Sequence, residues 1–219
     1  MKRSFVACVL GMAALCAGAR AGAWETVGTL DHFFPSADLW EGYALGGELK
    51  AVLWTTPRWG IGLTGGYTQW GVDDRATAVS NLVTDTWEGH ASYIPLGASI
   101  FARLGASNPG KASLTVEGGL RYMICDSQVE LMRTTIIPGD APDRESFDLD
   151  CEDGIVARIG VGIRWPLGNK DRPLELLLAG GYQFDLDKGD VTDDGWLGLR
   201  EEIELEAFYI ETGLVIPIR

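Results

Sequence analysis

The sequence has little positive charge and no long apolar run beyond its first 23 residues. Its 18 lysine and arginine residues stand against 31 aspartate and glutamate residues, which gives a formal charge of −13. Because nucleic-acid-binding surfaces are basic, this balance argues against a nucleic-acid partner. The apolar stretches after residue 23 are too short for a transmembrane helix, and no segment repeats apolar residues at helical spacing. An all-β protein is therefore expected.

The sequence also lacks the common motifs of catalysis and cofactor binding. It contains no phosphate-binding loop, no cysteine and histidine residues at zinc-site spacing, and no carboxylate dyad. Only two histidines are present, and His32 is isolated in the sequence. We therefore expect no cofactor, no resident metal and no catalytic activity.

The first 23 residues have the pattern of a secretory signal peptide. Lys2 and Arg3 precede the apolar segment FVACVLGMAALCAGA, and AGA at residues 21–23 fits an A-x-A cleavage site. Removal of this segment leaves one domain, residues 24–219, and takes away three basic residues, so that the formal charge becomes −16. The remaining chain is long enough to bury one sizeable core.

Alternating apolar and polar residues run through most of the mature chain and predict strands. Seven segments show this period of two: 43–55, 58–71, 87–104, 111–125, 153–166, 172–186 and 203–217. They exceed the about five or six residues usual in soluble sheets. They also reach the roughly ten residues that a tilted strand needs to cross a bilayer.

Short and long connections alternate between these strands. The short ones contain turn residues and lie at 55–58, 105–111 and 168–172, and the long ones cover 72–86, 126–152 and 187–202. This rhythm is typical of an antiparallel up-and-down transmembrane barrel, with short periplasmic turns and long outer loops. Because such barrels have an even number of strands, an eighth strand is predicted at Trp24–Leu30, with an outer loop at 31–42.

The segment Lys111–Cys125 shows the two faces of such a strand. Its even positions are apolar from Ala112 to Ile124, whereas its odd positions include Glu117 and Arg121. Alternation alone does not say which face meets water, and a soluble lipocalin-like barrel would turn the apolar face toward a ligand. The apolar faces are continuous, dense in leucine and isoleucine, and carry aromatic residues near the strand ends, as in an interfacial girdle. We therefore expect the charged face to line a narrow lumen.

The polar faces of the predicted strands carry four acidic and five basic residues. They are Glu48, Glu117, Glu175 and Glu211 together with Lys50, Arg103, Arg121, Arg158 and Arg164. Buried charges must be paired, because an unpaired one costs several kcal/mol. Since side chains nearly fill the lumen of an eight-stranded barrel, we expect a lumen closed by salt bridges. A gated ion path through the same charges is the alternative.

Two cysteines remain in the mature chain, Cys125 and Cys151, one on each side of the longest connection. In an exported protein such a pair is more often a disulfide than a metal or redox site. We expect a structural disulfide that closes a hairpin centred at Pro138, with Val129 opposite Phe147.

The predicted outer loops are acidic, above all at 140–154 and 185–196. The second loop resembles a calcium loop only superficially, because Gly189 occupies a ligand position and no spaced terminal glutamate follows. Solvation of the loops explains this charge. Binding of divalent cations that bridge to anionic lipopolysaccharide is the alternative.

At this level the chain resembles the small eight-stranded barrels of bacterial outer membranes, of the OmpA, OmpX and OmpW type. The resemblance covers the mature chain and rests on the signal peptide, the rhythm of short turns and long loops, and the segments YIPLGASIFARLG and LTVEGGLRYMI. It implies a monomer in the outer membrane, surrounded by membrane lipid and lipopolysaccharide. The chain differs from these barrels at its last residue, Arg219, where they usually carry an aromatic residue.

A structural, adhesive or interaction role through the outer loops is the expected function. One local pattern supports an enzyme instead: His90 and Ser92, with Glu88 on the same side, resemble the His-x-Ser pair and separate glutamate of lipid A deacylase barrels. So short a match often arises by chance. A narrow channel for small solutes and a soluble periplasmic binder are the remaining alternatives.

Overall fold

A computed structural model of the chain describes residues 23–36, 40–72, 76–80, 83–104, 111–125, 128–135, 143–167, 174–192 and 200–218. Regular structure in these residues is β-strand throughout. The predicted signal peptide lies outside them, apart from Ala23. In the described ranges, no helix has the length and apolar character to cross a membrane.

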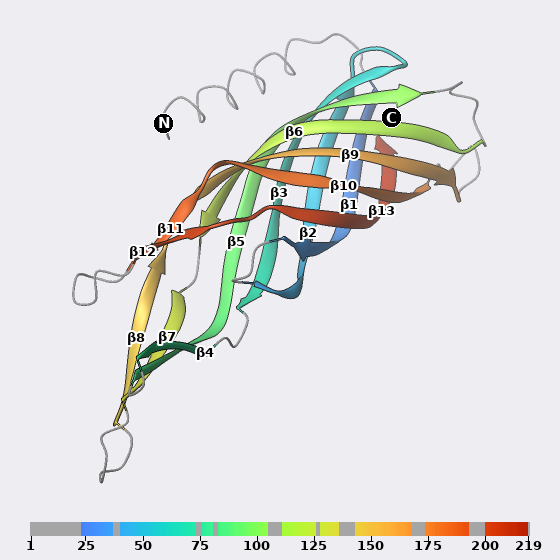
Figure 1. Cartoon of the computed structure of the whole chain (residues 1–219). Helices are drawn as coiled ribbons and strands as arrows, with labels where there is room; N and C mark the ends of the chain where they lie inside the picture. The colour runs from blue at the N-terminus through green and yellow to red at the C-terminus, as the bar shows by residue number, and fades with distance from the viewer. Residues whose placement is uncertain are drawn as a thin grey trace.

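Eight long antiparallel strands close into a barrel (Figure 1). They are β1 (Ala23–Pro35), β2 (Trp40–Trp54), β3 (Trp59–Val72), β5 (Val83–Leu104), β6 (Ser113–Cys125), β9 (Gly154–Pro166), β10 (Glu175–Asp187) and β13 (Ala207–Ile218). Each pairs with the next barrel strand along the chain, and β1 pairs with β13 to complete the ring. This up-and-down topology confirms the predicted fold class and number of barrel strands.

Five shorter strands form a sheet that extends from one end of the barrel. They are β4 (Ala76–Ser80), β7 (Gln128–Thr135), β8 (Asp143–Cys151), β11 (Gly189–Thr192) and β12 (Arg200–Ile203). Strand β5 belongs to both parts, because residues 83–89 pair with β4 and β7, while the rest pairs with β3 and β6. We call the five strands and residues 83–89 the outer sheet. Figure 1 shows it projecting away from the barrel, and the connection 55–58 between β2 and β3 lies at the opposite end.

Apolar side chains of the barrel strands point outward and charged side chains point inward. In β13 the exposed positions are Phe208, Ile210, Leu214 and Ile216, and the buried ones between them are Ala207, Tyr209, Glu211 and Val215. The other barrel strands repeat this orientation with exposed leucine, isoleucine and valine. A continuous apolar belt of this size is matched by lipid and not by water. The soluble alternative, which needs the opposite orientation, is wrong.

Aromatic residues mark both edges of the apolar belt. Exposed tryptophans lie near the short connections: Trp24, Trp59 and Trp165. Toward the outer sheet, the exposed aromatic residues are Phe34, Tyr43, Tyr67, Phe184 and Phe208. Tyr182 contacts Phe184 and Phe208 edge to face, with ring centroids 4.6 and 4.7 Å apart. Rings of this kind are typical of the two membrane–water interfaces.

The segments predicted as long loops are largely strands. The loop predicted at 31–42 is mostly strand because the alternation of β1 continues to Pro35. The connection 126–152 contains the β7–β8 hairpin, in which Val129 lies opposite Leu149 and Phe147 opposite Leu131. The predicted pairing of Val129 with Phe147 is therefore wrong by two residues.

The strand predicted at 203–217 is two strands. Strand β12 ends at Ile203 in the outer sheet, and β13 begins at Ala207 in the barrel. The segment between them is held to β10, because Leu205 receives a hydrogen bond on its carbonyl oxygen from Gln183 and donates its own N–H to Asp185. The boundary between the outer sheet and the barrel therefore lies between Ile203 and Ala207.

Candidate functional site

Charged side chains from most of the barrel strands meet in the interior as two clusters. The central cluster consists of Asp31, Glu48, Lys50, Glu117, Arg121, Arg158 and Glu211. The basal cluster, nearer the short connections, consists of Glu25, Arg103, Arg164 and Glu175. Both clusters form because inward positions recur every second residue along each strand.

Lys50 lies at the middle of the central cluster. Its Nζ donates hydrogen bonds to both carboxylate oxygens of Glu211 at 2.9 Å and to Oε2 of Glu117 at 2.8 Å. A carboxylate oxygen of Glu48 lies 3.8 Å away. One buried ammonium group thus joins β2, β6 and β13.

Two guanidinium groups complete the central cluster. Arg121 donates to Oε1 of Glu117 at 2.8 Å and to Oγ of Ser99 at 2.9 Å. Arg158 donates to Oε1 of Glu48 at 2.7 Å, and its guanidinium carbon lies 4.0 Å from the ring centroid of Tyr209. These contacts are of the charge-assisted kind, the stronger class of hydrogen bonds.

Glycines make room for these long side chains. A Cβ on Gly119 would lie 2.8 Å from Nη1 of Arg121, and one on Gly97 would also collide with the Arg121 side chain. On the other wall, a Cβ on Gly181 would lie 2.6 Å from the hydroxyl oxygen of Tyr209. Gly97, Gly119 and Gly181 are therefore required by a bulky side chain on the same strand or on the neighbouring strand.

The basal cluster is built around Glu25. Its carboxylate accepts hydrogen bonds from Arg103 at 3.1 Å and from Arg164 at 2.6 Å. Glu175 lies 3.8 Å from Arg164. The ring of Trp54 packs against both guanidinium groups, with centroid distances of 4.1 Å to Arg103 and 5.5 Å to Arg164.

Apolar layers separate and cover the two clusters. Between them lies a buried cluster of Val27, Val52, Trp54, Phe101, Leu177 and Val215. On the outer side, Phe33 packs against Trp70 at 5.4 Å and Tyr209 at 6.3 Å between ring centroids. A cavity beside Lys50 has a volume of about 20 Å³, which is enough for roughly one water molecule. Side chains therefore fill the interior of the described barrel.

Two members of the clusters were not predicted from the sequence, Glu25 and Asp31. Both lie on β1, whose inward positions are Glu25, Val27, Thr29, Asp31 and Phe33. The same spacing of two was present in the sequence. Asp31 was not predicted because it falls in the predicted loop 31–42, and Glu25 was not predicted because the apolar face of the predicted strand Trp24–Leu30 is weak.

The carboxylate oxygens of Asp31, Glu48 and Glu211 lie within 4.8 Å of one another, and all three side chains are buried. Among the described residues this is the one group of three side chains that could hold a metal ion. The oxygens of Glu48 and Glu211 already accept hydrogen bonds from Arg158 and Lys50. A metal ion would have to compete with these two cations.

The two cysteines lie where the barrel meets the outer sheet. In this structure both are thiols, and the hydroxyl group of Tyr93 lies 3.0 Å from Sγ of Cys151. A hydrogen bond with Cys125, together with burial, raises the pKa of the Cys151 thiol. The predicted disulfide remains a prediction, which thiol alkylation of the denatured, unreduced protein would check.

His90 and Ser92 lie on the same face of β5, as the sequence pattern requires. The hydroxyl group of Tyr67 donates to Oγ of Ser92 at 2.7 Å, and Ser92 is 4% exposed. By register, Glu88 lies opposite Glu130 on β7. The Ser92 hydroxyl is therefore covered and hydrogen bonded, in contrast to the accessible nucleophile that acyl transfer needs.

Of the acidic segments for which divalent-cation binding was the alternative, Asp140, Asp193 and Asp194 lie outside the described residues. Within the described part of the second segment, Asp185 accepts a hydrogen bond from the N–H of Leu205 at 2.8 Å. Lys188 forms an ion pair with Glu204. These carboxylates thus serve contacts within the fold.

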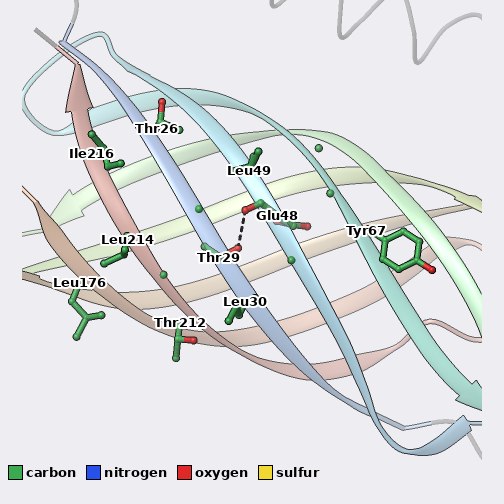
Figure 2. Close-up of a pocket in the computed structure, with 15 residues that line it drawn as sticks. Thr26, Thr29, Leu30, Glu48, Leu49, Tyr67, Leu176, Thr212, Leu214 and Ile216 are labelled. Atoms are coloured by element: carbon green, nitrogen blue, oxygen red, sulfur yellow. Dashed lines mark hydrogen bonds between the residues drawn. The ribbon is translucent and has the colours of Figure 1, made fainter.

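The lipid-facing surface has a hollow of about 820 Å³ across β13, β1, β2 and β3. Its floor includes Gly28, Gly47 and Gly65, where neighbouring positions of the belt carry larger side chains. Figure 2 shows the surrounding rim, which includes Leu30, Leu49, Tyr67, Leu176, Leu214 and Ile216. The hollow lies within the apolar belt, and buried Thr29 and Glu48 are also among the residues that line it.

No protein-family model matches the sequence, and no curated protein matches it. Among solved structures, the chain is similar to the outer membrane protein OprG from Pseudomonas aeruginosa, with a TM-score of 0.60, 10% identity, and coverage of 92% of this chain and 98% of that chain. It also aligns over 90% of its length with outer membrane protein W of E. coli, at a TM-score of 0.48 and 15% identity over 98% of that chain. Neisserial surface protein A gives a TM-score of 0.48 and 11% identity over 90% of this chain and 99% of that chain.

At 10% identity, the similarity to OprG supports the fold. The apolar belt and its aromatic edges independently require a lipid environment. Fold and belt together define the class: the chain is a small eight-stranded β-barrel protein of the outer membrane.

Proposed function

We propose that the protein is a surface-binding platform without catalytic activity. In this proposal the barrel anchors the chain as a monomer, and the outer sheet binds a partner with a basic surface. The observation that carries the proposal is the outer sheet itself. The long connections of the barrel pair with one another into one hydrogen-bonded sheet, in the order β12, β11, β8, β7, β5 and β4.

A preformed sheet is suited to binding because its backbone is already ordered. A flexible loop has to lose conformational entropy when it binds, whereas paired strands have lost most of it on folding. The β7–β8 hairpin alone pairs over eight residue positions, from Gln128 with Asp150 to Thr135 with Asp143. The outer sheet therefore presents a surface of fixed shape.

The charge of the hairpin indicates the chemistry of the partner. Residues 126–153 contain nine acidic and two basic residues. Complementary charge increases the rate of association and disfavours acidic partners. A basic protein surface fits this segment, and nucleic acid does not.

The filled interior favours a closed lumen and argues against a channel. An ion that crossed the barrel would have to break the contacts of Lys50 and Glu211 and pass the layer around Phe101. Both steps are costly, because each separates buried charges or opens a packed core.

A hairpin-deletion variant tests the platform. Residues 128–151 are replaced by a two-residue Asn-Gly turn, and the protein is reconstituted in nanodiscs of uncharged lipid with poly-L-lysine as the basic probe. We expect the deletion to lose most of the binding, and the slower gel mobility after boiling to be retained as a sign of an intact barrel. Equal binding by the deletion variant would contradict the proposal.

A charge-neutralised variant separates the contribution of the sheet from that of its charge. Glu145→Gln with Asp148→Asn and Asp150→Asn keeps the hairpin and removes three of its acidic residues. Weaker binding with a flatter salt dependence is the expected result. A steady conductance in planar bilayers would support the channel alternative, and lipid A shortened by the wild type but not by Ser92→Ala would support the enzyme.

A further inference from the structure

Asp31 is the most unusual charged group of the interior. Its side chain is 1% exposed, and neither of its carboxylate oxygens has a hydrogen-bond partner among the described residues. The nearest cation is Arg158, whose Nη1 lies 3.6 Å from Oδ2 of Asp31, beyond hydrogen-bonding distance. A buried carboxylate without donors is expensive, because it has lost its hydration and gained nothing in return.

The strand register places a second carboxylate directly against Asp31. Asp31 on β1 is the cross-strand partner of Glu211 on β13. Glu48 on β2 also brings a carboxylate oxygen within 4.8 Å of the other two. Like charges directly opposite each other destabilise a sheet, and two carboxylates that share a site seldom ionise together.

The charges of the central cluster do not balance. The groups that face Asp31 or its partners come from β2, β6, β9 and β13: Glu48, Lys50, Glu117, Arg121, Arg158, Tyr209 and Glu211. With Asp31 the cluster holds four carboxylates against three cationic side chains. One positive charge is therefore missing from a site whose side chains are all buried except Glu117, which is 14% exposed.

The hydrogen bonds show which carboxylate takes up this charge. Glu117 accepts three hydrogen bonds of 2.8 Å, from Lys50, Arg121 and Ser99. Glu211 accepts from Lys50 through both oxygens, and Glu48 accepts from Arg158. Asp31 has none of these donors. The free-energy cost of protonation is therefore lower at Asp31 than at the other three carboxylates. A proton also fits better than a metal ion, because Lys50 and Arg158 already occupy the oxygens that a metal ion would need.

We propose that Asp31 is a buried proton-binding site: its protonated carboxyl group donates a hydrogen bond to a neighbouring carboxylate of the central cluster. The bound proton neutralises the cluster and joins β1 to the network on β2 and β13. When Asp31 ionises at high pH, the closed interior holds one uncompensated negative charge. The stability of the barrel then falls as pH rises, because the folded chain holds a proton that the unfolded chain has released.

The variant Asp31→Asn tests the site, because asparagine has the shape of the protonated group and does not titrate. The urea midpoint of the detergent-solubilised protein is measured from about pH 6 to about pH 9. We expect the wild-type midpoint to fall over this range, and the midpoint of the variant to stay level and to lie above wild type at the alkaline end. A variant that is destabilised equally at every pH would overturn the proposal, because Asp31 would then act as an ionised partner of Arg158.

Infrared spectroscopy gives a direct readout that does not depend on stability. The wild type at neutral pH should show the carbonyl stretching band of one protonated carboxylic acid, which disappears on alkalinisation and is absent from Asp31→Asn. Glu211→Gln is the matched control, since it removes a carboxylate that accepts two hydrogen bonds from Lys50 and should lower the midpoint across the whole range. A wild type without the protonated band would overturn the proposal.

Metal analysis decides between a proton and a metal ion. The wild-type protein is dialysed against buffer containing sodium or calcium and its bound metal is counted. We expect no bound equivalent and the same midpoint in sodium, potassium and choline salts. One equivalent of metal that is lost in Asp31→Asn would overturn the proton site in favour of a metal site.

Discussion

The two charged clusters of the interior differ in their balance of acidic and basic residues and in their exposure to solvent. The basal cluster has two acidic and two basic residues, and its members Arg103 and Glu175 are partly open to solvent near the short connections. The central cluster has four acidic and three basic residues and lies between Phe33 and Trp70 on one side and the apolar layer on the other, with Glu117, at 14% exposed, as its most accessible member. The charges therefore balance in the cluster that is more open to solvent and do not balance in the cluster that is more deeply buried.

This difference shows that burial alone does not explain the arrangement of lumen charges. A balanced ion-pair network in a narrow lumen could be replaced by packed apolar residues without loss of stability. A network with one cation too few does more than fill space, because it needs a bound proton or another ion to balance its charge. Its stability therefore depends on pH or on that ion. We therefore expect substitutions in the two clusters to differ in size, with the largest effects at the centre.

The largest effect is expected for Lys50→Met. The substitution removes the cation shared by Glu117 and Glu211 and leaves a sealed site with four carboxylates. Breaking a buried ion pair from one side costs about 3–5 kcal/mol. Urea unfolding in detergent micelles measures this loss. The double variant Lys50→Met with Glu211→Gln should recover part of it, and a single variant as stable as wild type would show that the cluster carries little energy.

A smaller loss is expected for Arg164→Met in the basal cluster. Arg164 donates to Glu25 at 2.6 Å and is 2% exposed, but Arg103 remains as a second donor to the same carboxylate. The expected cost is about 1.5–3 kcal/mol, that of one hydrogen bond to a charged group. Arg103→Met is the matched control, because its side chain is 17% exposed and should cost less. The reverse order of these two losses would contradict the view that solvent relieves the basal cluster.

The glycine pair of β6 gives a steric test of the central cluster. Gly119→Ala places a Cβ 2.7 Å from the carbonyl oxygen of Ala98 and 2.8 Å from Arg121, which should cost about 1–3 kcal/mol as overpacking does. Gly118→Ala points to open space on the outer face and should be neutral or slightly stabilising. The two urea midpoints are compared directly. Equal midpoints would show that Arg121 can move aside at little cost.

Most of the barrel could be predicted from the sequence because a membrane strand repeats one simple pattern. In β9 the lipid-facing apolar residues from Ala157 to Trp165 alternate with arginine and glycine without a break, so this strand was found with its faces. Of the outer sheet, only the hairpin between Cys125 and Cys151 was predicted, and its register was wrong by two residues. Strands β4, β11 and β12 were not predicted, because four or five residues are too few for alternation to separate a strand from a loop.

The candidate site could be predicted as a set of charged side chains that point inward. The balance of acidic and basic residues in each cluster could not be predicted. Spacing assigns Glu48, Lys50 and Arg158 to one face, yet it does not say which groups meet across a lumen, because that depends on the stagger of strands far apart in the chain. Asp31 and Glu25 were missed on a strand whose outward positions include Thr26, Gly28 and His32, a weak apolar face. The residue that leaves the central cluster unbalanced was therefore the one that the pattern could not place.

The smallest effect is expected for Lys188→Met, outside the interior. Lys188 pairs with Glu204 at the edge of the outer sheet, and the two side chains are 38% and 41% exposed. An exposed ion pair contributes below about 1 kcal/mol and is screened by salt, because water already solvates both groups. The urea midpoint should therefore change little at low salt and not at all at about 1 M salt. A loss of stability as large as that of Lys50→Met would mean that the number of ion pairs, and not their burial, determines the stability of this protein. The contrast between the two clusters would then have no energetic basis.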